Sequence, residues 1–339
     1  MTEGGLTLEP LGGLDEVRAE WAALAEAAGN PFATPEWCEL WLGHIGSGLE
    51  QLFFASRRKD GTPAAIVPLV VTRGRYVRKA RFLGFGPSNE LGPIASPADR
   101  EAAAAVLREA LAATRGEWDA FIGEHLPGSG WASRLGATLV GRTADPVVRG
   151  QWESWDDYLA SRSSNFRQEL RRKKRRLRER GLSFREVCDA GELDGALDVL
   201  FELHRARWGE QASRWFAGRE AFQREFSRVA LERGWLRVSL MELEGRPVAA
   251  YHGLRFGESE WSYQFGRDPA EDGSSVGLLV AAHAVRRSIE EGAAAFRLGP
   301  GDQPYKLRFA TGDDGLETVG RARGLRGRAA LIAARRRGV

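Results

Sequence analysis

The spacing of apolar positions divides the chain into helical and extended stretches. Leu193, Leu197 and Leu200 recur every three or four residues, as on one face of a helix, and Phe222 and Phe226 repeat this spacing. Short apolar runs bounded by turn residues are typical of strands. Helices are predicted over residues 14–28, 99–114, 165–180, 192–208, 218–233 and 276–291, with a short one beginning at Pro35. Strands are predicted over residues 52–56, 64–72, 118–123, 182–187, 235–243, 247–256, 260–266, 294–299 and 306–310.

The second half of the chain has the clearer order of elements. One strand is followed by two helices, three closely spaced strands, a helix, a buried strand and a short terminal strand at 306–310. The turns at 244–246 and 257–259 are short enough to join the three strands as an antiparallel meander. This order indicates an α/β fold, with a mixed sheet that carries helices on its faces.

The length of the chain indicates more than one domain. Its 339 residues exceed what a single compact core usually holds, so we expect two domains. We place the first at residues 1–150 and the second, which carries the working site, at 151–310; a basic segment, 311–339, could pack back on the first. Both halves run helices, strands, a loop, a helix and a strand, so they could be distant copies. No run approaches the ~20 apolar residues that a transmembrane helix needs.

Basic residues are concentrated in two segments. Residues 161–181 contain ten Lys or Arg and two Glu, and residues 318–339 contain seven Arg and no acid, whereas the net charge is only +3. Because a solvated helix face usually mixes both signs of charge, we predict an anionic partner for the helix 165–180. Guanidinium groups suit bidentate contact with phosphate. The candidate contacts are Arg167, Arg171, Arg172, Arg175 and Arg176.

Charge alone does not identify that anionic partner. A tRNA acceptor stem, a nucleotide-linked or lipid-linked acceptor and an anionic membrane surface all remain open. The basic helix lacks the interleaved stacking aromatics that are typical of RNA-binding motifs.

Cysteine usage and the N-terminal stretch indicate the compartment. Cys38 and Cys188 are far apart and have no metal or redox spacing, so we expect no metal site. Met1–Pro10 contains two glutamates and no basic residue, which does not fit a secretory signal. We therefore expect a reduced, cytoplasmic setting.

Five short segments give the chain a family resemblance. They are residues 30–37 (Asn-Pro-Phe-Ala-Thr-Pro-Glu-Trp), 165–177, 203–208 (Leu-His-Arg-Ala-Arg-Trp), 245–250 (Gly-Arg-Pro-Val-Ala-Ala) and 301–306 (Gly-Asp-Gln-Pro-Tyr-Lys). In their order and spacing they resemble the GNAT superfamily of acyltransferases, and within it the bacterial CelD/BcsL-like, cellulose-biosynthesis-type acetyltransferases. The chain is also similar to the Fem-type transferases, which carry two GNAT-like domains and move aminoacyl groups from tRNA. The resemblance implies a GNAT fold, with a degenerate GNAT-like first domain.

This resemblance implies a coenzyme A thioester, such as acetyl-CoA, as the acyl donor. The superfamily's pyrophosphate loop, Arg/Gln-x-x-Gly-x-Gly/Ala, corresponds to residues 274–279, where Gly277 fits but Ser274 and Leu279 depart from the pattern. A helix N-terminus still offers N–H groups to a phosphate. A backbone N–H near Phe265-Gly266 could stabilise the oxyanion of acyl transfer. The candidate cofactor-binding residues are Phe265, Gly266, Ser275, Val276, Gly277 and Leu278.

The same resemblance points to five candidate catalytic residues. Tyr305 could protonate a departing thiolate, Lys306 could neutralise a phosphate or carboxylate, and Asp302 could orient either. His252 lies in the middle of a predicted strand and is either a core residue or the base that deprotonates the acceptor. His204 lies one turn before a tryptophan on the apolar face of its helix, where packing and catalysis are equally open.

Three functions remain open. The leading hypothesis is an acyltransferase that moves an acyl group from coenzyme A to an amine or hydroxyl of a small or envelope-related acceptor. A Fem-like transferase that uses aminoacyl-tRNA would account for both the altered pyrophosphate loop and the basic helix. A non-catalytic protein on a GNAT scaffold, bound to nucleic acid or anionic lipid, is the third.

Overall fold

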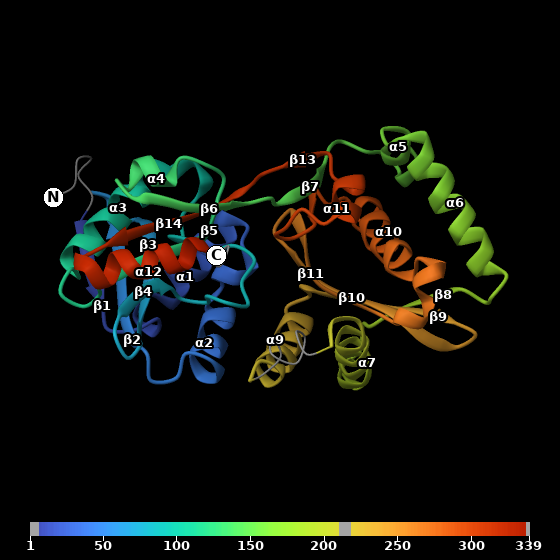
Figure 1. Ribbon diagram of the computed structural model, residues 1–339, viewed down its shortest axis with the longest axis horizontal. Coiled ribbons are helices and arrows are strands. Elements are labelled where there is room, and N and C mark those ends of the chain that lie inside the picture. Colours follow the sequence, from blue (N-terminus) through green and yellow to red (C-terminus); the bar gives the residue numbers. More distant parts are fainter. Residues whose placement is uncertain (1–6, 210–217, 337–339) are drawn as a thin grey trace. The chain divides into compact units, whose positions relative to one another are not determined.

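The computed structural model describes residues 7–209 and 218–336, which form two compact units (Figure 1). The first unit comprises residues 1–144 and 314–339, and the second comprises residues 145–313. Residues 1–6, part of the stretch in which we expected no signal, and residues 337–339 of the basic C-terminal segment lie outside the described residues. Among the described residues, no helix is both long enough and apolar enough to cross a bilayer.

The first unit is built on a seven-stranded sheet with the strand order β1-β2-β3-β4-β5-β14-β6. Neighbouring strands are antiparallel, except that β4 and β5 are parallel. Its strands are β1 (Thr7–Leu11), β2 (Glu50–Arg57), β3 (Pro63–Arg73), β4 (Arg78–Phe82), β5 (Ala120–Pro127), β6 (Thr138–Thr143) and β14 (Leu316–Ala322). Its helices are α1 (Arg18–Ala28), α2 (Pro35–His44), α3 (Arg100–Ala113), α4 (Trp131–Arg134) and α12 (Gly324–Arg336), with 3-10 turns η1 (Asp15–Val17), η2 (Pro31–Ala33) and η3 (Pro97–Asp99).

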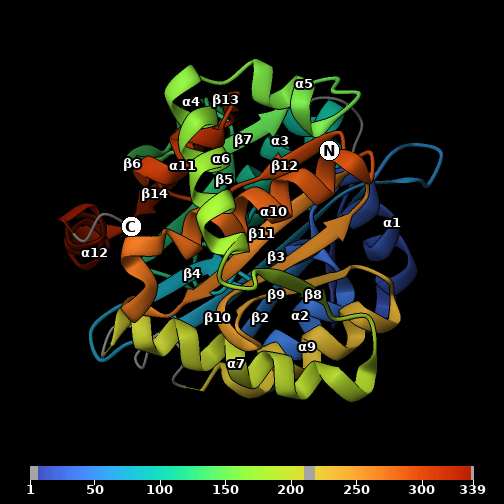
Figure 2. The ribbon, with the colours of Figure 1, turned by 90° about the vertical axis from the view of Figure 1, so that its right-hand side faces the viewer.

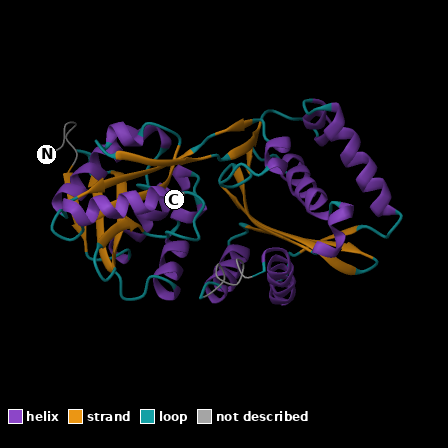
Figure 3. Ribbon diagram, in the orientation of Figure 1, coloured by secondary structure: helices purple, strands orange, loops and turns teal. Residues whose placement is uncertain are grey.

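The second unit repeats this sheet, with the order β13-β7-β12-β11-β10-β9-β8 and a single parallel pair, β11 with β12. Both units combine helices with a mixed sheet, and each contains three consecutive strands, β2–β4 in the first and β9–β11 in the second (Figure 3). Its strands are β7 (Pro146–Arg149), β8 (Ser183–Glu186), β9 (Leu236–Leu243), β10 (Arg246–Phe256), β11 (Ser259–Arg267), β12 (Ala295–Arg297) and β13 (Gly312–Asp313). Its helices are α5 (Trp155–Ala160), α6 (Ser164–Arg178), α7 (Ala190–Trp208), α9 (Glu220–Glu232), α10 (Val276–Glu290) and α11 (Pro304–Phe309), with the 3-10 turn η4 (Pro269–Ser274).

Helices cover both faces of the second sheet (Figure 2). On one face, Val280 of α10 shares a core with Tyr251 of β10 and with Phe166 and Leu170 of α6. On the other face lie α7 and α9. The helix α6 begins where the Ser163 hydroxyl accepts a hydrogen bond from the Phe166 amide, a normal N-cap. Its narrow apolar stripe is what attaches this otherwise charged helix to the core.

One strand of each sheet comes from a distant part of the sequence. In the first sheet β14, which follows the second unit in sequence, lies between β5 and β6. In the second sheet β7, which precedes the rest of that unit, lies between β12 and β13. The two strands occupy the same place in the two sheet orders, but only β14 lies beyond the other unit in sequence, since β7 belongs to the continuous segment 145–313.

The structure confirms the predicted α/β fold with mixed sheets and corrects several predicted elements. The predicted strand at 306–310 is wrong, because Pro304 begins the helix α11. Proline favours the first helical turn, where its missing N–H is not needed. The sequence pattern missed the strands β1, β4, β6, β7, β13 and β14, which are short or come from segments that carried no clear alternation.

Candidate functional site

The parallel strands β11 and β12 separate at the centre of the second sheet. Ser259–Trp261 pairs with Ala295–Arg297, and beyond that point β11 continues to Arg267 paired only with β10. A bulge in β11 sits between the residue pairs Ser262–Gly253 and Gln264–His252. Bulges of this kind change which backbone groups face the neighbouring strand. The separation leaves one edge of β11 open.

Strand alternation decides which amide lies on that open edge. Asp268 N–H donates to the Val248 carbonyl of β10 at 2.8 Å. Alternate residues of a strand direct their backbone groups to the same side, so Gly266 also faces β10 while Phe265 faces the open edge. The Phe265 amide therefore lies on the open edge of β11.

Gly266 has a packing role instead of the predicted oxyanion role. A Cβ atom at Gly266 would lie 2.8 Å from the Leu203 Cβ and 2.9 Å from the Leu200 carbonyl oxygen of α7. Only a residue without a side chain allows α7 to lie this close to β11. Gly266 fixes the distance between the helix and the sheet.

The N-terminus of α10 lies just after this strand and has unusual backbone geometry. Ser275 has a positive φ of 59°, in the left-handed region, and its side chain does not cap the helix. The Leu278 amide is bonded to the Ser275 carbonyl at 3.0 Å, which leaves the amides of Val276 and Gly277 as the first-turn donors. The first turn of α10 contains no acidic residue. A helix end of this type attracts anions.

An arginine lies over this helix end. A Cβ atom at Gly277 would come within 2.9 Å of the Arg267 Cδ, so the Arg267 side chain crosses the first turn of α10 and ends on Asp272. The other acids of η4 and its flank are also paired, Asp268 with Arg246 and Glu271 with Arg180. Arg267, at the end of β11, is thus a basic residue beside the start of α10, where the sequence has Ser274.

A second arginine, from α7, lies near the same place. Burial lowers the pKa of Arg207, and the charge of Arg267 lowers it further, while Tyr305 opposes the shift. Among the described residues, no carboxylate pairs with the Arg207 guanidinium, which lies 4.5 Å from the Trp208 ring centroid. Sequence reasoning missed both arginines, although Arg207 lies inside one of the segments that carried the resemblance.

Tyr305 joins this group of residues from α11. Its ring lies edge-on to Phe265, with 6.4 Å between the ring centroids. Burial raises the pKa of Tyr305 to about 12, although Arg207 opposes that shift. The phenol is therefore protonated at neutral pH and can act as a donor.

Lys306 and Asp302 are placed differently from what was predicted. The Lys306 ammonium is buried and donates to the carbonyls of Gly299 and Pro300 at 2.9 and 2.8 Å. Burial lowers its pKa to about 8. Because its charge already holds the loop between β12 and α11, we correct the predicted phosphate-binding role of Lys306 to a structural one. Asp302 is exposed in that loop.

The two candidate histidines lie on the α7 and α9 side of the sheet. His252 is only 4% exposed, and its Nε2 lies 3.0 Å from the Ser227 hydroxyl of α9. Burial lowers its pKa to about 4, which fits a neutral core histidine. His204 is half-buried on α7, and burial together with Arg207 lowers its pKa to about 4. His204 thus lies three residues from the arginine of the site, whereas His252 is enclosed in the α9 layer.

The predicted basic contacts on α6 divide into two kinds. Arg167 donates to the carbonyls of Ala160 and Arg162, which ties the end of α5 to α6. This bonding corrects its predicted role as an anion contact. Arg171, Arg172, Arg175 and Arg176 are exposed, and within the described ranges they form no ion pair. These four remain candidate contacts for an anion.

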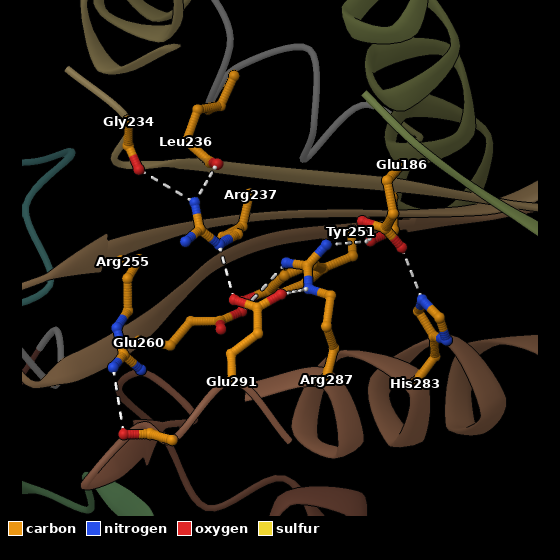
Figure 4. Close-up of polar contacts among 12 residues, drawn as sticks. Glu186, Gly234, Leu236, Arg237, Tyr251, Arg255, Glu260, His283, Arg287 and Glu291 are labelled. Carbon is orange, nitrogen blue, oxygen red and sulfur yellow. Dashed lines mark hydrogen bonds and ion pairs between the residues drawn. The ribbon is translucent and has the colours of Figure 1, made fainter. Parts of the chain in front are cut away.

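A separate polar network crosses the core between β8, β10 and α10 (Figure 4). The Tyr251 hydroxyl donates to the fully buried Glu260 at 2.8 Å, and Arg287 lies 3.6 Å from the same carboxylate. Burial raises the pKa of Glu260 to about 7. Glu186 accepts from Arg287 and lies 2.7 Å from His283 Nε2. Within the described part of the chain, no group of three His, Cys, Asp or Glu residues could hold a metal ion.

Comparison with known proteins agrees with this geometry. Residues 164–307 match the family described as the acetyltransferase (GNAT) domain. A search of curated proteins found no match.

Solved structures with the same fold cover nearly the whole chain. The crystal structure of FemX has a TM-score of 0.65 at 12% identity and covers 96% of this chain and 100% of its own. A tandem GNAT protein from the clavulanic acid biosynthesis pathway has a TM-score of 0.52 at 13% identity, covering 94% and 98%. L-PGS from Bacillus licheniformis has a TM-score of 0.57 at 14% identity, covering 94% and 95%. Residues 164–307 therefore match the acetyltransferase (GNAT) domain family, and both units together have the fold of tandem GNAT proteins.

Proposed function

We propose that the second unit transfers an acyl group, ordinarily acetyl, from a coenzyme A thioester to an amine or hydroxyl acceptor. The observation that carries this proposal is the uncapped N-terminus of α10, crossed by Arg267 and adjacent to the open edge of β11. The amides of Val276 and Gly277, together with Arg267, would hold the pyrophosphate of the donor. The donor would supply the acyl carbonyl and a thiol leaving group.

The remaining residues of the site would act on the acyl carbonyl and on the thiol leaving group. The Phe265 N–H would stabilise the oxyanion that forms when the acceptor attacks the carbonyl carbon, a contribution of about 10²–10³ in rate. Tyr305 would donate its proton to the thiolate as the carbon–sulfur bond breaks. The proton lost by the acceptor would pass to solvent, because a pKa of about 4 makes His204 a weak base at neutral pH. The raised pKa of Tyr305 keeps its hydroxyl protonated for this role.

Thermal stability with and without coenzyme A tests donor binding. At about 100 times its dissociation constant, a ligand adds ~2.7 kcal/mol to the stability of the folded state, which raises the unfolding midpoint by several degrees. Gly277→Leu should abolish this shift by displacing Arg267 and covering the amides. Gly273→Leu is the matched control, because a Cβ atom at Gly273 meets nothing within 4 Å. No shift in the unsubstituted chain would reject coenzyme A as donor.

Tyr305→Phe separates chemistry from donor binding. The substitution keeps the ring that packs on Phe265 and removes only the hydroxyl, so coenzyme A should still stabilise the chain. The rate of acetyl-CoA turnover, measured by the release of free thiol, should fall by about 10²–10⁴. An unchanged rate would remove Tyr305 from the mechanism.

A second candidate is a Fem-like transfer from aminoacyl-tRNA to an envelope-related acceptor. It is favoured by the exposed, unpaired arginines of α6 and by the fold shared with FemX. Binding of tRNA through 6–10 phosphates would weaken by about 10³–10⁵ between 50 and 200 mM salt. Replacing Arg171, Arg172, Arg175 and Arg176 together with Glu should abolish such binding, and retention of binding would exclude this helix as the contact. Membership of the CelD/BcsL-like branch stays a prediction.

A further inference from the structure

Two adjoining cavities lie between α6, β8 and α10. The larger has a volume of about 360 Å³ and is lined by Lys174, Arg178, Arg286, Arg287, Glu290 and the segment 182–184, together with His283. The smaller has a volume of about 80 Å³. Lys174, Leu182, Phe184, His283 and Arg286 line both, so the two cavities form one continuous pocket.

The larger cavity carries an excess of positive charge. Arg287 is paired with Glu186, and Arg286 is paired with Glu290 at 2.8 Å. Among the described residues, neither Lys174 nor Arg178 forms an ion pair within 4.0 Å, although Glu290 opposes the lowering of the Lys174 pKa. Burial lowers the pKa of Lys174, and the neighbouring charges of Arg286 and Arg178 lower it further. An anion placed among these groups would relieve their mutual repulsion.

The smaller cavity is mostly apolar and suits a short hydrocarbon group. Its walls include Leu159, Leu170, Leu279, Ala282 and Trp155. Its 80 Å³ equals the volume of about three water molecules, which a short alkyl group can fill. Stacked rings of Phe184 and His283, with 3.9 Å between centroids and 6° between planes, form the wall shared with the charged part. One end of the pocket therefore selects negative charge and the other selects an apolar group.

We propose that this pocket binds a small phosphate ester, with the phosphate between Lys174, Arg178 and Arg286 and a short apolar group against Leu279 and Ala282. At about 360 Å³ the charged cavity is at the lower end of the range for small-molecule sites. Along α10 the pocket is lined by residues from Leu279 to Glu290, and it is not lined by Val276, Gly277 or Leu278. It is thus a second site, independent of the proposed donor site.

Titration calorimetry on the full chain tests the proposal with three probes. Butyl phosphate should bind more tightly than inorganic phosphate, because only the ester fills the apolar cavity. Ala282→Leu fills that cavity with a larger side chain. It should reduce the affinity for butyl phosphate to that for inorganic phosphate. Dihexanoyl phosphatidic acid distinguishes the source of the phosphate: tighter binding than butyl phosphate assigns a lipid headgroup, and weaker binding assigns a soluble metabolite.

A matched pair of arginines on α6 provides the control. Arg178→Gln should weaken butyl phosphate about tenfold or more, the loss of one charge-assisted contact. Arg176→Gln removes the same charge from an exposed position that lines neither cavity, and it should have no effect. Equal weakening by both variants, or no binding of butyl phosphate at 10 mM, would overturn the proposal. Displacement of butyl phosphate by coenzyme A would also overturn it, whereas failure of coenzyme A to bind at all would count only against the proposed donor.

Discussion

The two units share a sheet order. They differ in the segment that connects the first strand of the parallel pair to the following helix. In the second unit, residues 268–275 connect β11 to α10, and the edge of β11 beyond Trp261 stays open. In the first unit the longer segment 83–99 connects β4 to α3. The Leu91 amide of that segment donates to the His125 carbonyl of β5 at 3.1 Å, and Ile94 pairs with Ile66 of β3. The same opening is thus filled by the chain itself in the first unit.

The charge at the N-terminus of the following helix also differs between the two units. The start of α3 carries Asp99 and Glu101, and Asp99 pairs with Arg58 at 2.8 Å. The first turn of α10 has no acid and lies under Arg267. Acids at a helix N-terminus stabilise it and occupy the place of an anionic ligand. A shared fold therefore does not mean a shared site, because the site depends on local loops and charges.

The largest expected effect comes from β14, the strand of the first unit that follows the second unit in sequence. Val319 of β14 is fully buried in the core of that unit, so Val319→Asp should cost about 4 kcal/mol or more. Calorimetry should show the midpoint of one transition falling by about 10 °C, and the transition that coenzyme A raises should keep its midpoint. Ala322→Asp, at the exposed end of the same strand, is the control. A parallel fall of all transitions would mean that the units unfold as one.

A smaller effect concerns the pH dependence of the folding stability of the second unit. The folded-state pKa of Glu260 is raised from 4.5 to about 7, so the folded state binds its proton more tightly than the unfolded chain does. The contribution of Glu260 to folding stability, at most about 3 kcal/mol, is complete below pH 4.5. It is lost as the pH rises through 7. Glu260→Gln should remove this slope from urea unfolding measured between pH 4.5 and 7.5. Glu258→Gln, exposed on the same hairpin, should leave the slope intact, and a slope that persists in Glu260→Gln would assign it to another group.

The smallest effect tests the charge difference between the two helix ends. Arg267→Gln should weaken coenzyme A about tenfold, because one charge-assisted contact to phosphate is lost. Arg58→Gln, which removes the arginine beside the start of α3, should leave the affinity unchanged. Titration calorimetry measures both. If the two variants weakened coenzyme A equally, the donor would not be held by the N-terminus of α10 alone.

Local sequence pattern determined most of the helices and central strands. The helices 192–208 and 276–291 were predicted almost to the residue, because each buries one regularly spaced apolar face. The strand predicted at 306–310 failed, because a short segment of mixed residues has no periodicity that separates strand from helix. The strands β7 and β14 were missed, because their burial comes from partners distant in sequence.

The sequence by itself also predicted Gly277 in a pyrophosphate loop and Tyr305 as a proton donor, through the family resemblance. Only the tertiary structure brought Arg207 and Arg267 to the same place, since they belong to different elements with no common motif. It alone showed that Lys306 bonds two carbonyls and that His252 is enclosed by α9. Spacing along a chain determines which residues share a face, whereas burial and charge partners depend on elements far apart in the sequence.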